Sequence, residues 1–185
     1  MKSKPFSEQS LKALHRELGI PADYGTRRQL SMMPEANAEE LVSVGHFGPR
    51  EILLDAAAAA AWRQLQAAAK RANLSLLPLS GFRSWTRQAE IIRTKLAAGH
   101  AIESILTTNA APGYSEHHTG RAVDIGTPGD PPFAESFATT PAFKWLEGHA
   151  SSHDFRMSFP PQNPHGICYE PWHWCWFPGE HPAEN

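Results

Sequence analysis

An aspartate lies inside a short apolar run that follows two adjacent histidines, in the segment PGYSEHHTGRAVDIG. The run around Val123 and Ile125 predicts a strand. A half-buried strand does not carry a carboxylate without a partner, because burying an unpaired charge is costly. Asp124 therefore requires a partner in the fold, and His117 and His118 are close to it in the sequence.

Composition restricts the class of protein. The chain has 185 residues, enough for one domain, and its 41% hydrophobic and 19% charged residues indicate a globular protein. The net charge of −2, without a block of lysine or arginine, gives no indication of a nucleic-acid partner. No apolar run reaches the roughly 18 residues of a membrane span, and the N-terminus lacks the apolar stretch of a signal peptide. We expect a cytoplasmic protein, or an envelope or periplasmic one if an export signal has been removed.

The order of predicted elements indicates an α+β fold, in which a small antiparallel sheet has helices packed on one side. Helices are expected at 11–18, at 56–73 behind the N-cap Asp55, at 87–99 and at 139–150. Strands are expected at 41–45, 51–55, 74–81, 121–126, 155–159 and 167–177. We expect one domain, 1–185, with a helix and arm at 1–40, a core at 41–176 and a tail at 177–185.

Three side chains of the chain match the donors of a catalytic zinc, which takes three protein ligands and keeps one position open. His117, Asp124 and His173 supply two imidazoles and one carboxylate. The cation would also neutralise Asp124. Adjacent residues of an extended chain point in opposite directions, so only one of His117 and His118 is expected to bind. Spacing alone barely separates the two.

Two further residues fit a hydrolytic mechanism. Glu170 is the natural general base, since a carboxylate near a zinc-activated water accepts its proton. Pro171 interrupts the expected strand and allows Glu170 and His173 to reach one site. Arg83, at the end of an expected strand, would stabilise the developing oxyanion. The alternatives are a structural zinc or a polar core whose groups satisfy one another.

The motifs SGFRS with Gln88 downstream, SEHHTGRAVDI and YEPWHW occur in this order. Together they resemble the VanY-type D-alanyl-D-alanine carboxypeptidases, the M15 group of zinc peptidases. The motifs cover about residues 74–176, the stretch from residue 41 also looks like the family, and residues 1–40 resemble it weakly. It implies the small α+β zinc peptidase fold shared with the Hedgehog signalling domain, Zn²⁺ as cofactor, and a peptidoglycan stem peptide or muropeptide as substrate. A monomer without a membrane span or nucleic-acid partner is expected.

The family pattern Ser-x-His-x-x-Gly-x-Ala-x-Asp implies roles for individual residues. It selects His117 over His118 as a ligand, beside Asp124. The pattern Glu-Pro-Trp-His implies Glu170 as the base and His173 as the third ligand, and the family arginine corresponds to Arg83. Substrate contacts are implied for Ser115, Gln88 and Trp172.

The reaction expected from this resemblance is hydrolysis of the C-terminal D-alanine peptide bond, as in a DD- or LD-carboxypeptidase. The alternatives are a D-Ala-D-Ala dipeptidase, an L-Ala-D-Glu endolysin-type peptidase, and a zinc-stabilised peptide-binding module without activity. Family members commonly carry a basic residue where this chain has Cys175. That cysteine is a rival metal ligand or a disulfide partner of Cys168, although we expect it to act as a small apolar residue.

Overall fold

The computed structural model describes residues 8–179, so residues 1–7 and 180–185 of the expected terminal segments lie outside the described part. The helices are α1 Glu8–Glu17, α2 Tyr24–Arg27, α3 Ala56–Arg71, α4 Trp85–Ala97, α5 Ile102–Thr108 and α6 Pro141–His149. The 3₁₀ turns are η1 Ala38–Glu40, η2 Glu116–Thr119, η3 Glu135–Thr139 and η4 Ala150–His153. The strands are β1 Leu41–Phe47, β2 Arg50–Asp55, β3 Leu77–Ser80, β4 Ala122–Gly126, β5 Phe155–Met157 and β6 His173–Trp176.

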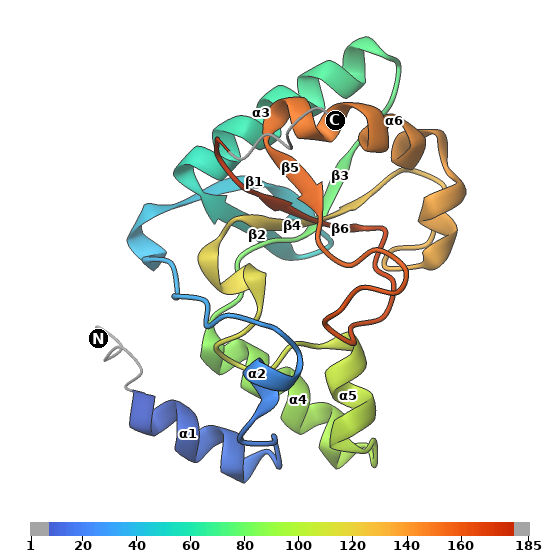
Figure 1. Ribbon diagram of the computed structural model, residues 1–185. Helices are drawn as coiled ribbons and strands as arrows, with labels where there is room; N and C mark the ends of the chain where they lie inside the picture. Colours follow the sequence, from blue (N-terminus) through green and yellow to red (C-terminus); the bar gives the residue numbers. More distant parts are fainter. Residues whose placement is uncertain (1–7, 180–185) are drawn as a thin grey trace.

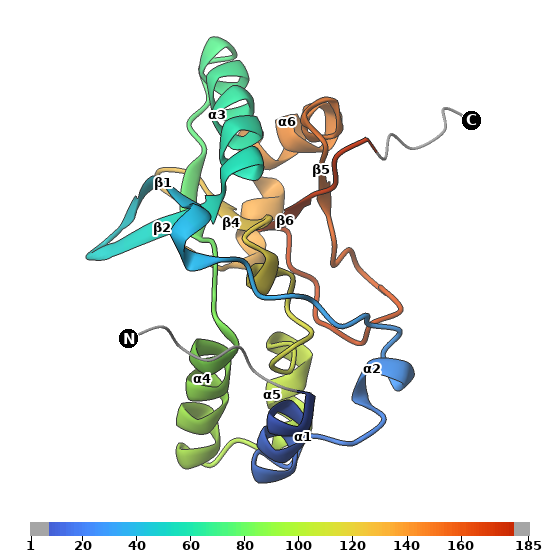
Figure 2. The ribbon, with the colours of Figure 1, turned by 90° about the vertical axis from the view of Figure 1, so that its left-hand side faces the viewer.

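The strands form two antiparallel sheets, a β1–β2 hairpin and a four-stranded sheet in the order β3-β4-β6-β5. Helices α3 and α6 lie on one side of these sheets, whereas α1, α4 and α5 gather on the opposite side of the molecule (Figures 1 and 2). The predicted α+β class with antiparallel sheets is confirmed. Helices α1 and α4 of the second group were expected as helices, but their position on the opposite side of the molecule was not predicted.

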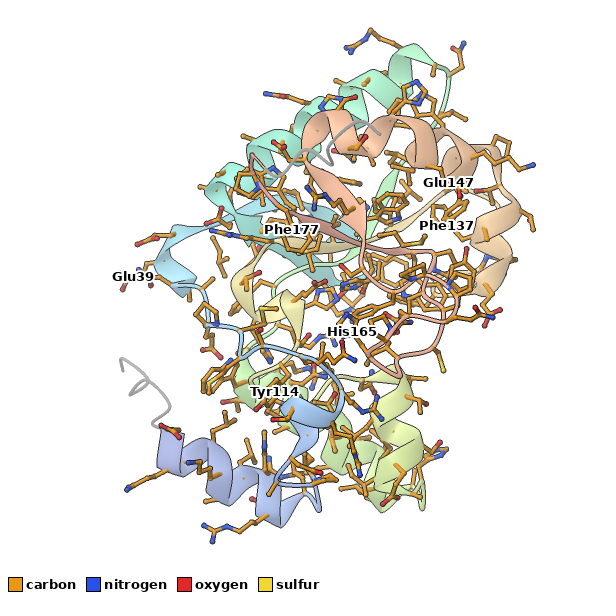
Figure 3. The ribbon with its side chains drawn as sticks, viewed as in Figure 1. Glu39, Tyr114, Phe137, Glu147, His165 and Phe177 are labelled. Atoms are coloured by element: carbon orange, nitrogen blue, oxygen red, sulfur yellow. The ribbon has the colours of Figure 1, made fainter. Side chains whose placement is uncertain are left out.

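Each group of helices has its own apolar core. The core beneath α3 and α6 is built around Trp62, Leu65, Val123, Ile125 and Trp174. The core between α1, α4 and α5 contains Leu11, Leu14, Tyr24, Ile92 and Ile105. Figure 3 shows Phe137 of the first core near α6 and Tyr114 beside the lower helices. The site described below lies on the face of the four-stranded sheet that is turned away from α3 and α6.

Local sequence signals explain where several elements begin. Asp55 caps α3 as predicted, because its carboxylate accepts hydrogen bonds from the backbone N–H groups of Ala57 and Ala58. Ser84 caps α4 in the same way, accepting from the N–H of Arg87. Pro78 lies in β3, an edge strand whose register shifts between Pro78 and Ser80.

Three segments differ from the sequence-based expectations. Residues 21–40 are not only an arm, because α2 and η1 form within them, and α5 was not expected. Residues 167–172 are not part of a strand. Their backbone turns instead, since the N–H of His173 donates to the carbonyl of Glu170 at 3.0 Å. In the described part of the chain, no helix combines the length and apolar character that crossing a bilayer requires.

Candidate metal centre and active site

The central strand pair places an aspartate directly beside a histidine. β4 and β6 are antiparallel neighbours, and Asp124 is paired with His173 in their register. Their side chains share one face of the sheet, where Asp124 Oδ1 lies 3.1 Å from His173 Nδ1. Both residues are buried.

His117 reaches this pair from the η2 turn that precedes β4. Its Nε2 atom lies 3.3 Å from Asp124 Oδ2, and its Nδ1 lies 2.7 Å from the carbonyl oxygen of Gly81. The turn ends at Gly120, whose φ of 68° belongs to the left-handed region. A Cβ atom there would lie 2.8 Å from the backbone nitrogen of Asp55, so glycine is required for this approach. One donor atom each from His117, Asp124 and His173 lies within 4.8 Å of the others.

His118 faces away from this group. Its Nδ1 lies 2.6 Å from the carbonyl oxygen of Arg83, and its Nε2 accepts a hydrogen bond from the N–H of Gly113 at 3.1 Å. Burial lowers the pKa of His118 to about 4, so the ring is neutral and holds two loops together. The two histidines diverge because they lie on a 3₁₀ turn, not on the extended chain that the sequence suggested.

The two imidazoles are the partners that Asp124 required. Burial raises the pKa of Asp124, but the charge of His117 and hydrogen bonds from His117 and His173 outweigh it, so the pKa is lowered. Burial lowers the pKa of His173, yet hydrogen bonds to Asp124 and Glu116 raise it to about 10. The described chain therefore balances the buried carboxylate with histidine protons. The same atoms form a donor set of the kind that a divalent cation takes.

A cavity of about 520 Å³ opens over this group. Its walls include Asp124, Glu170 and both histidines of the group, so Glu170 faces the same space as the three donor residues. Burial raises the pKa of Glu170 to about 7, against the opposing charge of His173. A carboxyl group with a pKa near neutrality is suited to take up and release a proton.

Arg83 lies on the same wall of the cavity and is held by two side chains. Its guanidinium donates to Gln88 Oε1 at 3.0 Å and to Ser80 Oγ at 3.2 Å. Burial lowers the pKa of Arg83, while the charges of Asp124 and Glu170 act in the opposite direction. The charged group is thus fixed in the cavity before any ligand arrives.

The three expected substrate contacts have different positions. Ser115 and Trp172 line the cavity. Gln88 is fully buried behind Arg83, and its amide nitrogen donates to the carbonyl of Ala110 at 2.6 Å. Gln88 is not among the residues that line the cavity.

Some residues of the cavity were not singled out from the sequence. Glu116 lies against His173, with Oε2 2.8 Å from Nε2, and the ring of Phe159 lies 4.9 Å from the same imidazole. Lys95 also lines the cavity and forms no ion pair within residues 8–179; its ammonium is 3.4 Å from the hydroxyl of Thr108. Glu116 is adjacent to His117 in the sequence, and this indicated that it would lie near the site. Nothing local indicated Lys95 or Phe159.

Both cysteines are free, Cys168 exposed and Cys175 buried. The predicted disulfide alternative is therefore wrong. Burial raises the pKa of the Cys175 thiol well above its usual value, so the group stays protonated. Cys175 is not among the three residues whose donor atoms converge.

Comparison with known proteins gives a consistent result. The family model described as "VanY: D-alanyl-D-alanine carboxypeptidase" matches residues 51–179. The putative carboxypeptidase YodJ of Bacillus subtilis is 28% identical over 173 residues, which covers 90% of this chain and 59% of that protein. A D-alanyl-D-alanine carboxypeptidase of Enterococcus faecium is 29% identical over 51% of this chain and 27% of its own length. The chain thus spans less than two thirds of these curated relatives.

Solved structures show the same fold. The structure of the LdcB LD-carboxypeptidase superposes with a TM-score of 0.62 at 28% identity, covering 84% of this chain and 68% of that one. A vancomycin-resistance D,D-pentapeptidase VanY in complex with Zn(II) gives a TM-score of 0.60 at 23% identity, covering 80% and 85%. The predicted peptidase fold is confirmed.

Proposed function

Because the chain belongs to the VanY family of D-alanyl-D-alanine carboxypeptidases, we propose that it is a zinc-dependent carboxypeptidase that removes the C-terminal D-alanine of peptidoglycan stem peptides. The observation that carries this proposal is the convergence of His117, Asp124 and His173 beneath a cavity that Glu170 also faces. A structural metal site needs neither a neighbouring carboxyl group with a raised pKa nor a fixed guanidinium.

The donor chemistry fits zinc. Two imidazole nitrogens and one carboxylate oxygen, all buried, leave one coordination position for a ligand from the cavity, as catalytic zinc sites do. We assign His117 Nε2, a carboxylate oxygen of Asp124 and His173 Nδ1 as the ligand atoms, because these are the atoms that face one another. When bound there, zinc would supply a Lewis acid that polarises the scissile carbonyl and lowers the pKa of water.

The protein's own groups carry the proton transfers. The Glu170 carboxylate accepts a proton from the attacking water and then donates it to the leaving amine of D-alanine. Arg83 donates hydrogen bonds to the carbonyl oxygen on which negative charge develops. Gln88 and Ser80 hold the guanidinium in place, so little reorganisation is required during the reaction. Ser115 and Trp172 contribute to the walls that orient the peptide.

Lys95 is the group that we assign to the terminal carboxylate of the substrate. Arg83 is held by Gln88 and Ser80 and is assigned to the carbonyl oxygen, so Lys95, which has no carboxylate partner within residues 8–179, is the cation of the cavity wall that remains for the carboxylate. Burial, followed by the charge of Arg83, lowers the pKa of Lys95, and the negative charge of an incoming carboxylate would stabilise the charged ammonium. The predicted substrate end therefore lies along the α4 side of the cavity.

The decisive experiment incubates zinc-loaded protein with stem tripeptide, tetrapeptide and pentapeptide and with free D-Ala-D-Ala, and identifies the products by mass spectrometry. Release of D-alanine from the pentapeptide indicates a DD-carboxypeptidase, and release from the tetrapeptide an LD-carboxypeptidase. Lys95→Met should raise KM with little change in kcat. Cleavage confined to the free dipeptide or to the L-Ala-D-Glu bond would contradict the proposal, as would zinc binding without hydrolysis.

A further inference from the structure

Glu116 contacts the ring of His173 on the side opposite Asp124. Its Oε2 atom lies 2.8 Å from His173 Nε2, while Asp124 Oδ1 lies 3.1 Å from Nδ1 of the same ring. The Glu116 side chain is only 13% exposed and that of His173 only 3%. The sequence pattern that selects the neighbouring residues leaves position 116 unspecified, and the proposed reaction gives this carboxylate no task.

The two histidines of the group present opposite nitrogens to Asp124. His117 has its Nδ1 on the carbonyl oxygen of Gly81, so Nδ1 carries the proton and Nε2 faces Asp124. His173 has its Nε2 on Glu116, so Nε2 carries a proton and Nδ1 faces Asp124. A hydrogen bond at one ring nitrogen decides which nitrogen is free to bind a metal. For His117 the hydrogen-bond partner is the backbone carbonyl of Gly81, whereas for His173 it is the carboxylate of Glu116.

The groups around Glu116 favour its contact with the imidazole of His173. The carboxylate of Glu116 forms an ion pair with His173 at 2.8 Å. The neighbouring group on β6 is the buried Cys175, which is not cationic. Phe159 lies 4.9 Å from the His173 ring at an interplanar angle of 34°, and so restricts the rotation of that ring.

We propose that Glu116 is a positioning residue that holds His173 with a proton on Nε2 and with Nδ1 directed at the metal. This inference rests on the proposed zinc site and deepens it. A carboxylate that accepts from the outer nitrogen of a ligand histidine fixes the ring orientation and increases its basicity as a ligand. Loss of such a partner lowers metal affinity about 10–100-fold.

The test compares Glu116→Ala with Glu116→Gln. The glutamine keeps an oxygen that accepts from Nε2–H, whereas alanine removes it. Glu135→Gln is the matched control, since Glu135 is an exposed acidic residue that lines the same cavity. Zinc dissociation constants are measured by competition with a chromophoric chelator. Protons on the histidine nitrogens are observed by NMR of the zinc-loaded protein labelled with ¹⁵N-histidine.

We expect Glu116→Ala to bind zinc about 10–100-fold more weakly and to lose the slowly exchanging Nε2–H signal of His173. Glu116→Gln should keep that signal and lose less affinity, and Glu135→Gln should match the wild type. The near-isosteric glutamine variant and a thermal melt separate this effect from misfolding. Wild-type zinc affinity in folded Glu116→Ala, or a proton on Nδ1 of His173 in the zinc-loaded wild type, would overturn the inference. A wild-type protein that binds no zinc would instead overturn the proposed function together with it.

Discussion

The two faces of strands β4 and β6 are equally buried but chemically opposite. Val123, Ile125 and Trp174 belong to the apolar core beneath α3 and α6. Asp124 and His173 alternate with them and face the cavity on the other side. Ile125 is 0% exposed and Asp124 is 4% exposed, so burial itself does not distinguish the two faces.

This difference separates stability from function within one pair of strands. The apolar face stabilises the fold by removing hydrocarbon surface from water, at about 25 cal/mol per Å². The polar face incurs the cost of burying charge, which the histidines and the proposed cation offset. A substitution on the apolar face should therefore reduce the free energy of unfolding. A substitution on the polar face should reduce metal binding and turnover.

The largest effect is expected from Asp124→Ala. Removing the carboxylate that both histidines contact takes away one of three donors, so zinc content should fall to background and turnover should be lost. Zinc is measured by elemental analysis of the folded fraction after dialysis. His118→Ala is the matched control, because that histidine lies on the same turn but faces away from the group. Full zinc content in Asp124→Ala would refute the ligand assignment.

The next largest effect is expected from Glu170→Gln. We expect zinc to remain bound and hydrolysis to fall by at least about 10²–10⁴-fold, because the general base is lost. The base acts when deprotonated, and burial raises the pKa of Glu170 to about 7 in the metal-free chain. Wild-type kcat/KM should accordingly fall toward low pH as this carboxylate becomes protonated, and the bound cation should move the midpoint below the value of the metal-free chain. Wild-type turnover by zinc-loaded Glu170→Gln would exclude the mechanism.

The pH dependence of the Tm provides a folding control for Glu170→Gln. A raised carboxyl pKa means that the folded state holds a proton more tightly, so the wild type loses this contribution as the pH rises from 4.5 to about 7. In metal-free Glu170→Gln, the side chain at position 170 does not titrate. Its Tm relative to the wild type should therefore increase over this pH range, while its activity remains low.

Ile125→Ala tests the apolar face of the same strand. Truncation of a fully buried isoleucine should reduce the free energy of unfolding by about 2–5 kcal/mol. The zinc content and kcat of the remaining folded protein should be unchanged. Denaturant unfolding and elemental analysis measure the two properties separately. Loss of zinc from folded Ile125→Ala would show that the two faces are coupled more strongly than we propose.

Cys175→Ser should have the smallest effect on the metal. The thiol is buried beside the polar face, but its atoms do not join the converging donors. Zinc content and turnover should stay close to the wild type, with a modest loss of stability from a buried hydroxyl. A metal-free Cys175→Ser protein would make the cysteine a ligand and would favour a closed, non-catalytic site.

Features that depend on residues close together in the sequence could be predicted. Asp55 at the start of α3 was identified because a cap depends only on the next few residues. The strand at β4 was identified from its apolar residues, and the spacing between His117 and Asp124 was read directly along the chain. Residues 167–172 misled the prediction, since their aromatic composition suits a strand while the turn at Glu170 prevents one.

The sequence by itself determined the family, the cap at Asp55 and the three candidate metal donors. Only the tertiary structure decided that Gln88 lies behind Arg83, that Lys95 borders the cavity and that Glu116 contacts the outer nitrogen of His173. The physical reason is distance along the chain. Glu116 and His173 are 57 residues apart, and the antiparallel pairing of β4 with β6 brings them together. No local propensity encodes such a contact, because it arises only when the strands have paired and the η2 turn has packed against them.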